Sequence, residues 1–111
     1  MRLITLTIGG VATPGDVVSV SYSAKRGGKT SGSHQVREGE TLADVAQGLA
    51  FSINTHWVQG LFDAKAKGET IRVQCADGAD DVTFGWRVER IVGANHLALA
   101  PGGDITVAIE E

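Results

Sequence analysis

The sequence has 111 residues and a mass of 11.6 kDa, enough for a single domain spanning 1–111. Ten Lys and Arg stand against thirteen Asp and Glu, a net charge of −3, and 42% of the residues are hydrophobic. This balance excludes a strongly basic nucleic-acid binder and a disordered chain. The apolar runs are too short for a transmembrane helix, and the lone Cys75 excludes an internal disulfide.

The N-terminal third of the chain predicts two strands and a polar connection. Residues 3–8 alternate Ile4, Leu6 and Ile8 with threonines, and residues 18–24 alternate apolar side chains with serines. A period of two is typical of a half-buried strand. The segment KRGGKTSGS, residues 25–33, has no apolar side chain and predicts a solvated hairpin loop or a mobile arm.

One helix is predicted over about 41–57. Its apolar residues recur at helical spacing and define one stripe: Leu42, Val45, Ala46, Leu49, Ala50, Ile53 and Trp57. Thr41 is a good N-cap, and Asp44 suits the positive end of the helix. Gly48 lies off the stripe, where glycine costs about 1 kcal/mol relative to alanine.

Strand patterns return after the helix. They cover residues 62–67, 70–76 and 82–88, a short piece around Leu97 and Leu99, and Ile105 to Ile109. The order of strands, helix, strands predicts an α+β fold. We expect a mostly antiparallel β-sheet, or a small β-sandwich, of six to eight strands with the amphipathic helix packed on it.

The sequence shows no catalytic, cofactor-binding or metal-ligating constellation. His34, His56 and His96 lie far apart, and none has the spacing of a helical metal site. Asp77, Asp80 and Asp81 lack the spacing of a calcium loop and predict a solvated acidic turn. Cys75 falls on the apolar side of a strand, which favours core packing.

Lys25, Arg26 and Lys29 form the only basic cluster of the sequence. Two interpretations remain open. The cluster is either a solvated surface loop or an arm that reaches across an interface to acidic residues of a neighbouring subunit, with the segment ADGADD as the candidate acceptor.

The segment 34–76 resembles a module of tailed-bacteriophage and prophage structural proteins. That module has a strand, then G-[DE]-T-L-x-x-[VI]-A-x-x-L-A-x-x-I-N, then a β-hairpin. The matching helix positions are Gly39, Glu40, Thr41, Leu42, Val45, Ala46, Leu49, Ala50, Ile53 and Asn54, and the hairpin matches at Gly68, Thr70, Ile71 and Val73. The opening segment also resembles the usual start of such domains.

The resemblance implies a non-enzymatic virion component, of the tail or tail tip, that is assembled in the bacterial cytoplasm. It implies a homo-oligomer whose partners are other virion proteins, with no cofactor, no nucleic acid and no membrane. A capsid decoration or spike protein is the alternative within the same class.

A carbohydrate- or peptidoglycan-binding module is the alternative from another class. The segment QVREGETLADVA also resembles the start of a lysin-motif domain, which would require a second helix across residues 55–66. Binding of a host-surface glycan usually needs an exposed aromatic side chain, and the candidates are Trp57, Trp86, Tyr22 and Phe51.

Overall fold

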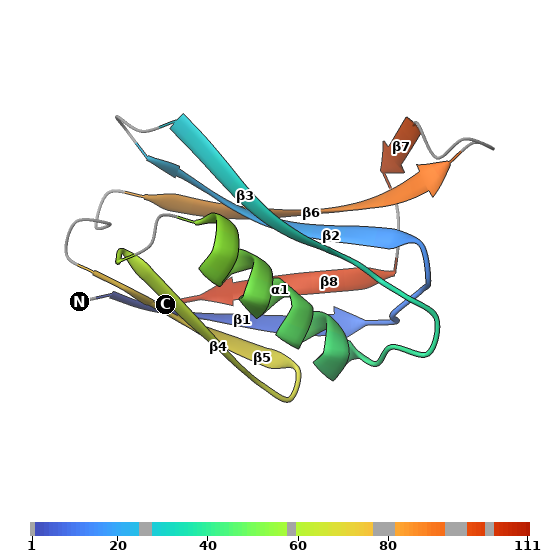
Figure 1. The fold of residues 1–111 in the computed structure, drawn as a ribbon, viewed down its shortest axis with the longest axis horizontal. Coiled ribbons are helices and arrows are strands. Elements are labelled where there is room, and N and C mark those ends of the chain that lie inside the picture. Colours follow the sequence, from blue (N-terminus) through green and yellow to red (C-terminus); the bar gives the residue numbers. More distant parts are fainter. Residues whose placement is uncertain (1, 25–27, 58–59, 77–81, 93–97, 102–103) are drawn as a thin grey trace.

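The computed structural model describes the chain except residues 1, 25–27, 58–59, 77–81, 93–97 and 102–103. The described residues form one helix and eight strands, whose arrangement Figure 1 shows. In chain order they are β1 (Arg2–Gly10), β2 (Asp16–Ala24), β3 (Gly28–Gln35), α1 (Leu42–His56), β4 (Phe62–Lys67), β5 (Thr70–Cys75), β6 (Thr83–Val92), β7 (Ala98–Pro101) and β8 (Ile105–Glu110). No helix in the described part of the chain has the length and apolar character needed to span a membrane.

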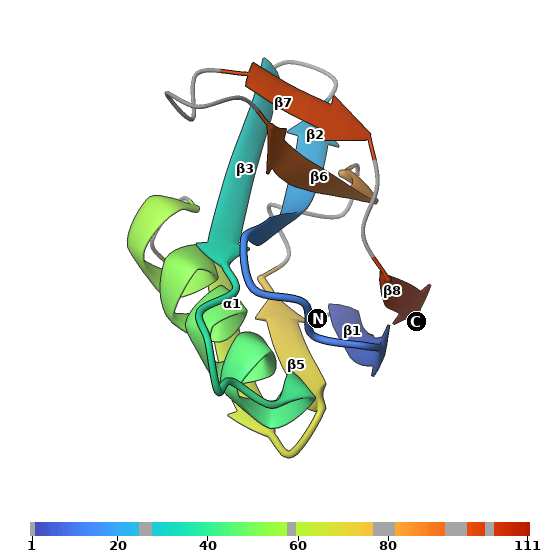
Figure 2. The ribbon, with the colours of Figure 1, turned by 90° about the vertical axis from the view of Figure 1, so that its right-hand side faces the viewer.

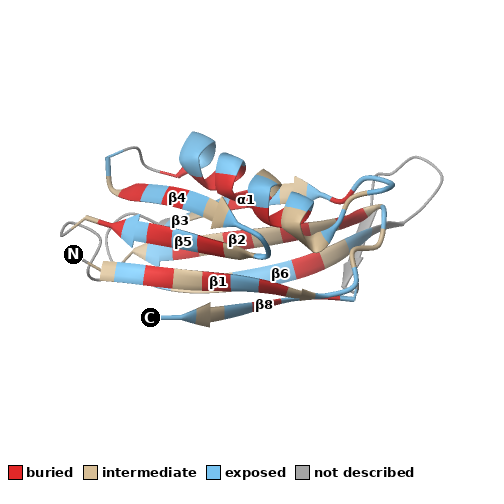
Figure 3. Ribbon diagram, turned by 90° about the horizontal axis from the view of Figure 1, so that it is seen from below, coloured by how far each residue is buried: buried red, intermediate tan, exposed pale blue. Residues whose placement is uncertain are grey.

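The strands form two four-stranded antiparallel sheets, in the orders β4-β5-β1-β8 and β3-β2-β6-β7. The α+β prediction of a small antiparallel sandwich with one helix is therefore confirmed. The alternation of apolar and polar residues explains the layers, because in β1 and β2 every second side chain points into the core. Figure 3 shows this alternation of buried and exposed positions along the strands.

Helix α1 begins where the sequence predicts. The Thr41 hydroxyl accepts the Asp44 backbone N–H, and the Asp44 carboxylate accepts the Thr41 backbone N–H at 2.8 Å, a complete capping box. The helix ends at His56, with Trp57 as the C-cap. The stripe residues Val45, Ala46, Leu49, Ala50, Ile53 and Trp57 are buried, and Leu42 packs against the core.

The position of α1 is more specific than the sequence indicates. The helix lies along one side of the sandwich, next to edge strand β3 of one sheet (Figure 2) and against edge strand β4 of the other. It thereby closes that side of the core. An aromatic cluster of Tyr22, Trp57, Phe62 and Phe84 fills the adjoining interior, with ring centroids 4.7–5.0 Å apart around Tyr22, Trp57 and Phe62.

The prediction of a solvated hairpin loop or a mobile arm over residues 25–33 is wrong from residue 28 onward. Residues 28–33 belong to β3, which pairs with β2 from Ala24↔Gly28 to Val17↔Gln35. The hydrophobic pattern misses this strand because its buried position, which faces the helix, is Gly32, a residue without a side chain. A Cβ on Gly32 would lie 3.2–3.3 Å from Ser52 and Ile53, so glycine lets the strand and the helix approach closely.

Candidate functional site

Two polar side chains of α1 bind the edge strands beside it. Ser52 accepts the backbone N–H of Ser33 in β3 through its hydroxyl oxygen, at 2.9 Å. The Asn54 amide donates to the carbonyl of Ala64 in β4 and accepts the N–H of the same residue, both at 2.8 Å. Asn54 therefore offers β4 the same two bonds that a neighbouring strand would offer.

The opposite side of the sandwich lacks such a cover among the described residues. Strand β8 pairs only with β1, and β7 pairs with β6 only over Glu89–Val92. The edge of β8 that faces away from β1, and the edge of β6 that faces away from β2 over residues 83–88, therefore have no strand partner in the part of the chain that is described. Edges of this kind present backbone donors and acceptors to a further strand.

A polar groove of about 520 Å³ lies on the helix side, between α1 and the segment from Ser33 to Glu40. Its floor and rim are mostly polar: Ser33, His34, Arg37, Glu40, Asp44, Gln47, Gly48, Ser52 and His56. Phe51 is the apolar side chain of the groove. It is 73% exposed, more than any other large hydrophobic side chain described.

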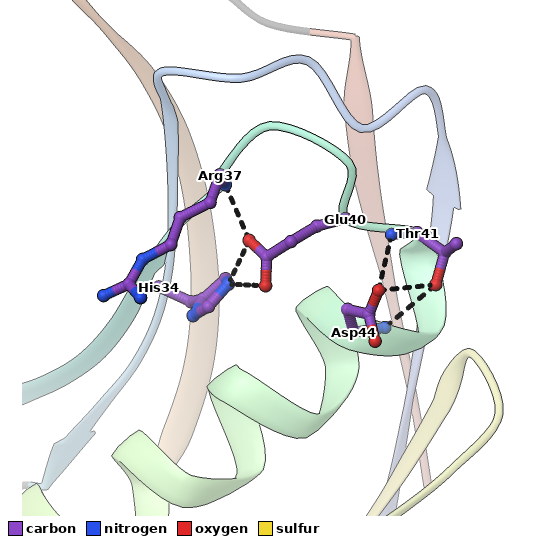
Figure 4. Close-up of polar contacts among 5 residues, drawn as sticks. All are labelled: His34, Arg37, Glu40, Thr41 and Asp44. Carbon is purple, nitrogen blue, oxygen red and sulfur yellow. Dashed lines mark hydrogen bonds and ion pairs between the residues drawn. The ribbon is translucent and has the colours of Figure 1, made fainter.

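Glu40 is held in a fixed position at one end of this groove (Figure 4). The backbone N–H of Arg37 donates to the Glu40 carboxylate at 2.6 Å, and His34 Nε2 lies 3.0 and 3.2 Å from its two oxygens. An ionised carboxylate has no proton to donate, so the Nε2–H of the imidazole is the donor.

The same contacts explain the acidity of Glu40. Burial raises the pKa of its carboxyl, and Asp44 adds a smaller effect in the same direction. The bonds from the Arg37 N–H and the His34 ring, together with the electrostatic attraction of His34, outweigh both effects and leave the pKa of Glu40 below its ordinary value. The groove thus holds an ionised carboxylate of fixed orientation.

The His34 ring lies against the helix at Gly48. A Cβ added at Gly48 would be 2.1 Å from His34 Nδ1 and 2.4 Å from Cε1, which no structure tolerates. Gly48 is therefore more than an unfavourable residue in a helix. It provides the space in which His34 reaches Glu40, and the His34 side chain is accordingly only 18% exposed.

A second hollow, of about 610 Å³, covers the outer face of β4, β5 and β1. Lys65, Lys67 and Arg72 gather there, and Lys65 lies directly opposite Arg72 in the strand register. The hollow also contains Asp63, whose carboxylate lies 4.0 Å from Lys65 Nζ, so the cations outnumber the acid three to one. Like charges in directly opposed positions are unfavourable in a sheet. On the far strand of the same sheet, β8, the exposed Glu110 carries the opposite charge.

The other residues that the sequence singles out differ in how far they are exposed to solvent. Trp57 and Tyr22 are only 2% and 6% exposed, so neither offers a surface to a ligand, whereas Trp86 is 44% exposed. Lys29 is exposed on β3, beside the serines of β2 and Ser31. Cys75 is buried, as expected.

Several predicted features lie outside the described residues: Lys25, Arg26, His96 and the acidic residues Asp77, Asp80 and Asp81. Within the described ranges, no three His, Cys, Asp or Glu side chains are grouped in a way that could hold a metal ion. His56 is exposed in the last turn of α1, where a cationic side chain favours the helix dipole.

Comparison with protein-family models, curated proteins and solved structures found no match for this chain. The lysin-motif resemblance does not extend past its first helix, because β4 begins at Phe62, inside the segment where that fold requires a second helix.

Proposed function

We propose that this chain is a non-enzymatic structural component of a bacteriophage virion, of its tail or tail tip, that acts through symmetric association with copies of itself and with other virion proteins. The resemblance of residues 34–76 to phage structural modules supports this assignment. One structural observation carries it: some strand edges are covered by side chains of the helix, and others are open. Ser52 and Asn54 bind the edge strands on the helix side, while among the described residues β8 has one unpaired edge and β6 has one over residues 83–88.

The charge distribution supports contacts between unlike surfaces of two copies. In the sheet β4-β5-β1-β8, the cations Lys65, Lys67 and Arg72 lie at the β4–β5 side, and Glu110 lies on β8. A copy that places its β8 side near the β4–β5 face of the next copy brings opposite charges together. Contacts between unlike surfaces close into a ring when the rotation between copies allows it.

The test is the association state of the purified chain, measured by size-exclusion chromatography with light scattering over increasing concentration. Ala108→Lys puts a cation on the exposed face of β8, where a lysine opposes further strand pairing. Thr7→Lys is the matched control, because Thr7 is the exposed cross-strand partner of Ala108 but lies on the interior strand β1. We expect Ala108→Lys to reduce association and Thr7→Lys to preserve it.

The position of the protein in the virion is tested separately, with gold-labelled antibody on particles recovered from cells that carry this gene. Label on tails supports the proposal, and label on capsids supports the decoration or spike alternative. A chain that stays monomeric at every concentration and labels no particle contradicts both.

A further inference from the structure

Three locally unfavourable features meet in the groove beside α1. Gly48 weakens the helix, the ionised Glu40 carboxylate bound by His34 is partly buried, and Phe51 leaves a large apolar surface in water. The rest of the helix follows the local rules, with a complete capping box and a buried apolar stripe. Features that break local rules tend to gather at functional sites.

We propose that this groove is a saccharide-binding site with Phe51 as its stacking platform. Asp44, Gln47 and Phe51 follow one another at i, i+3 and i+7 and line the groove together. The row spans about 10 Å along the helix axis, which is long enough for a short oligosaccharide. The Asp44 carboxylate can accept hydrogen bonds from sugar hydroxyls, and the Gln47 amide can both donate and accept them.

The composition of the groove favours a sugar over a protein partner. The core of a protein interface is apolar and lacks charge. Here one aromatic ring lies among hydroxyl, amide, imidazole and carboxylate groups. A sugar ring presents C–H groups on its face, which suit the negative face of an aromatic ring, and hydroxyl groups at its edge, which suit the polar rim.

The groove is also pre-formed, which lowers the entropy lost on binding. The Ser52–Ser33 bond fixes the helix against β3, and the Glu40 carboxylate is held by two partners. Asp44 is fixed by the capping box at the start of the helix. Gln47 and Phe51, the other two residues of the row, have exposed side chains and are carried by the helix that these bonds hold in place.

The experiment is a titration of the whole chain with chitotetraose and, separately, maltotetraose, followed by amide chemical shifts in NMR spectra. The sugar is raised to about 10 mM, which detects dissociation constants near 1 mM. We expect at least one sugar to shift the amides of Gln47, Gly48 and Phe51 in a saturable way. Phe51→Ala should weaken that binding by about tenfold while the spectrum stays that of a folded protein.

Trp86→Ala is the matched control, because Trp86 is the other exposed aromatic side chain described and lies on β6. Binding that survives Trp86→Ala and falls with Phe51→Ala supports the proposal. Three results overturn it: neither sugar shifts the spectrum, the shifts cluster on another face, or Phe51→Ala binds normally. This proposal and the proposed assembly are tested by different measurements. Ala108→Lys should leave sugar binding in the NMR titration unchanged, even if light scattering shows that it alters association.

Discussion

The contact between His34 and Gly48 predicts that alanine at position 48 has opposite effects in two backgrounds. A helical glycine replaced by alanine ordinarily gains about 1 kcal/mol of stability. In this chain the new Cβ would lie 2.1 Å from His34 Nδ1, so the imidazole must move away. It would then leave Glu40, whose oxygens it reaches at 3.0 and 3.2 Å.

The size of the effect follows from these two contributions. A hydrogen bond to a charged group contributes about 1.5–3 kcal/mol, and this one is partly buried. The loss of that bond offsets the helical gain, so Gly48→Ala alone should destabilise the protein by about 0.5–2 kcal/mol. In a His34→Ala background the obstacle is absent, and Gly48→Ala should stabilise by about 1 kcal/mol.

Urea unfolding, followed by circular dichroism, measures both values in a double-mutant cycle. The two effects of Gly48→Ala should differ by about 1.5–3 kcal/mol. Equal stabilisation of about 1 kcal/mol in both backgrounds would show that His34 does not rest on Gly48. That result would also remove one of the three arguments for the groove as a binding site.

Three further predictions concern other polar contacts of the fold. Asp16 is fully buried and bound at 3.0 Å by Arg90, so Arg90→Met should lower the free energy of unfolding in urea clearly more than Arg87→Met, since Arg87 pairs with Glu89 at the surface; equal effects of the two variants would contradict this role of Arg90. Asn54→Ala should cost about 1–3 kcal/mol, because both backbone groups of Ala64 lose their partner, and hydrogen exchange of the Ala64 amide should accelerate; a slow, unchanged Ala64 amide would contradict this assignment. Because the pKa of Glu40 is lowered by folding, its contribution to stability is complete above the ordinary glutamate pKa of about 4.3 and disappears as the pH falls through the lower folded value. Glu40→Gln should therefore flatten the stability–pH curve in that acidic range, and an unchanged curve would argue against the bonds from Arg37 and His34.

Most of the fold could be predicted from periodicity, and the exceptions have a common cause. The stripe from Val45 to Ile53 is visible because its buried positions carry apolar side chains. Strand β3 is not visible in this way, since its buried position facing the helix is Gly32, which has no side chain to reveal burial. Backbone pairing with β2 specifies that strand, and pairing leaves no trace in hydrophobicity.

The groove was less accessible to prediction from sequence. Glu40 belongs to the segment that leads into the helix, and nothing in the spacing of His34 and Glu40 indicates that they meet. Ser52 and Asn54 are ordinary polar residues of a helix until the edge strands are placed beside them. Phe51 carried the one available signal, because it is a large aromatic residue that falls outside the apolar stripe of the helix.

The placement of β1 governs the order in which this chain can fold. Its first strand is an interior strand of its sheet, and its two partners, β5 and β8, come from residues 70–75 and 105–110. The hairpins β2–β3 and β4–β5 are local and can form early, whereas β1 must wait for segments far along the chain. Completion of the sheet therefore depends on β8, which leaves the ribosome long after β1. Until then both edges of an apolar strand are exposed, and the nascent chain is open to aggregation during that interval.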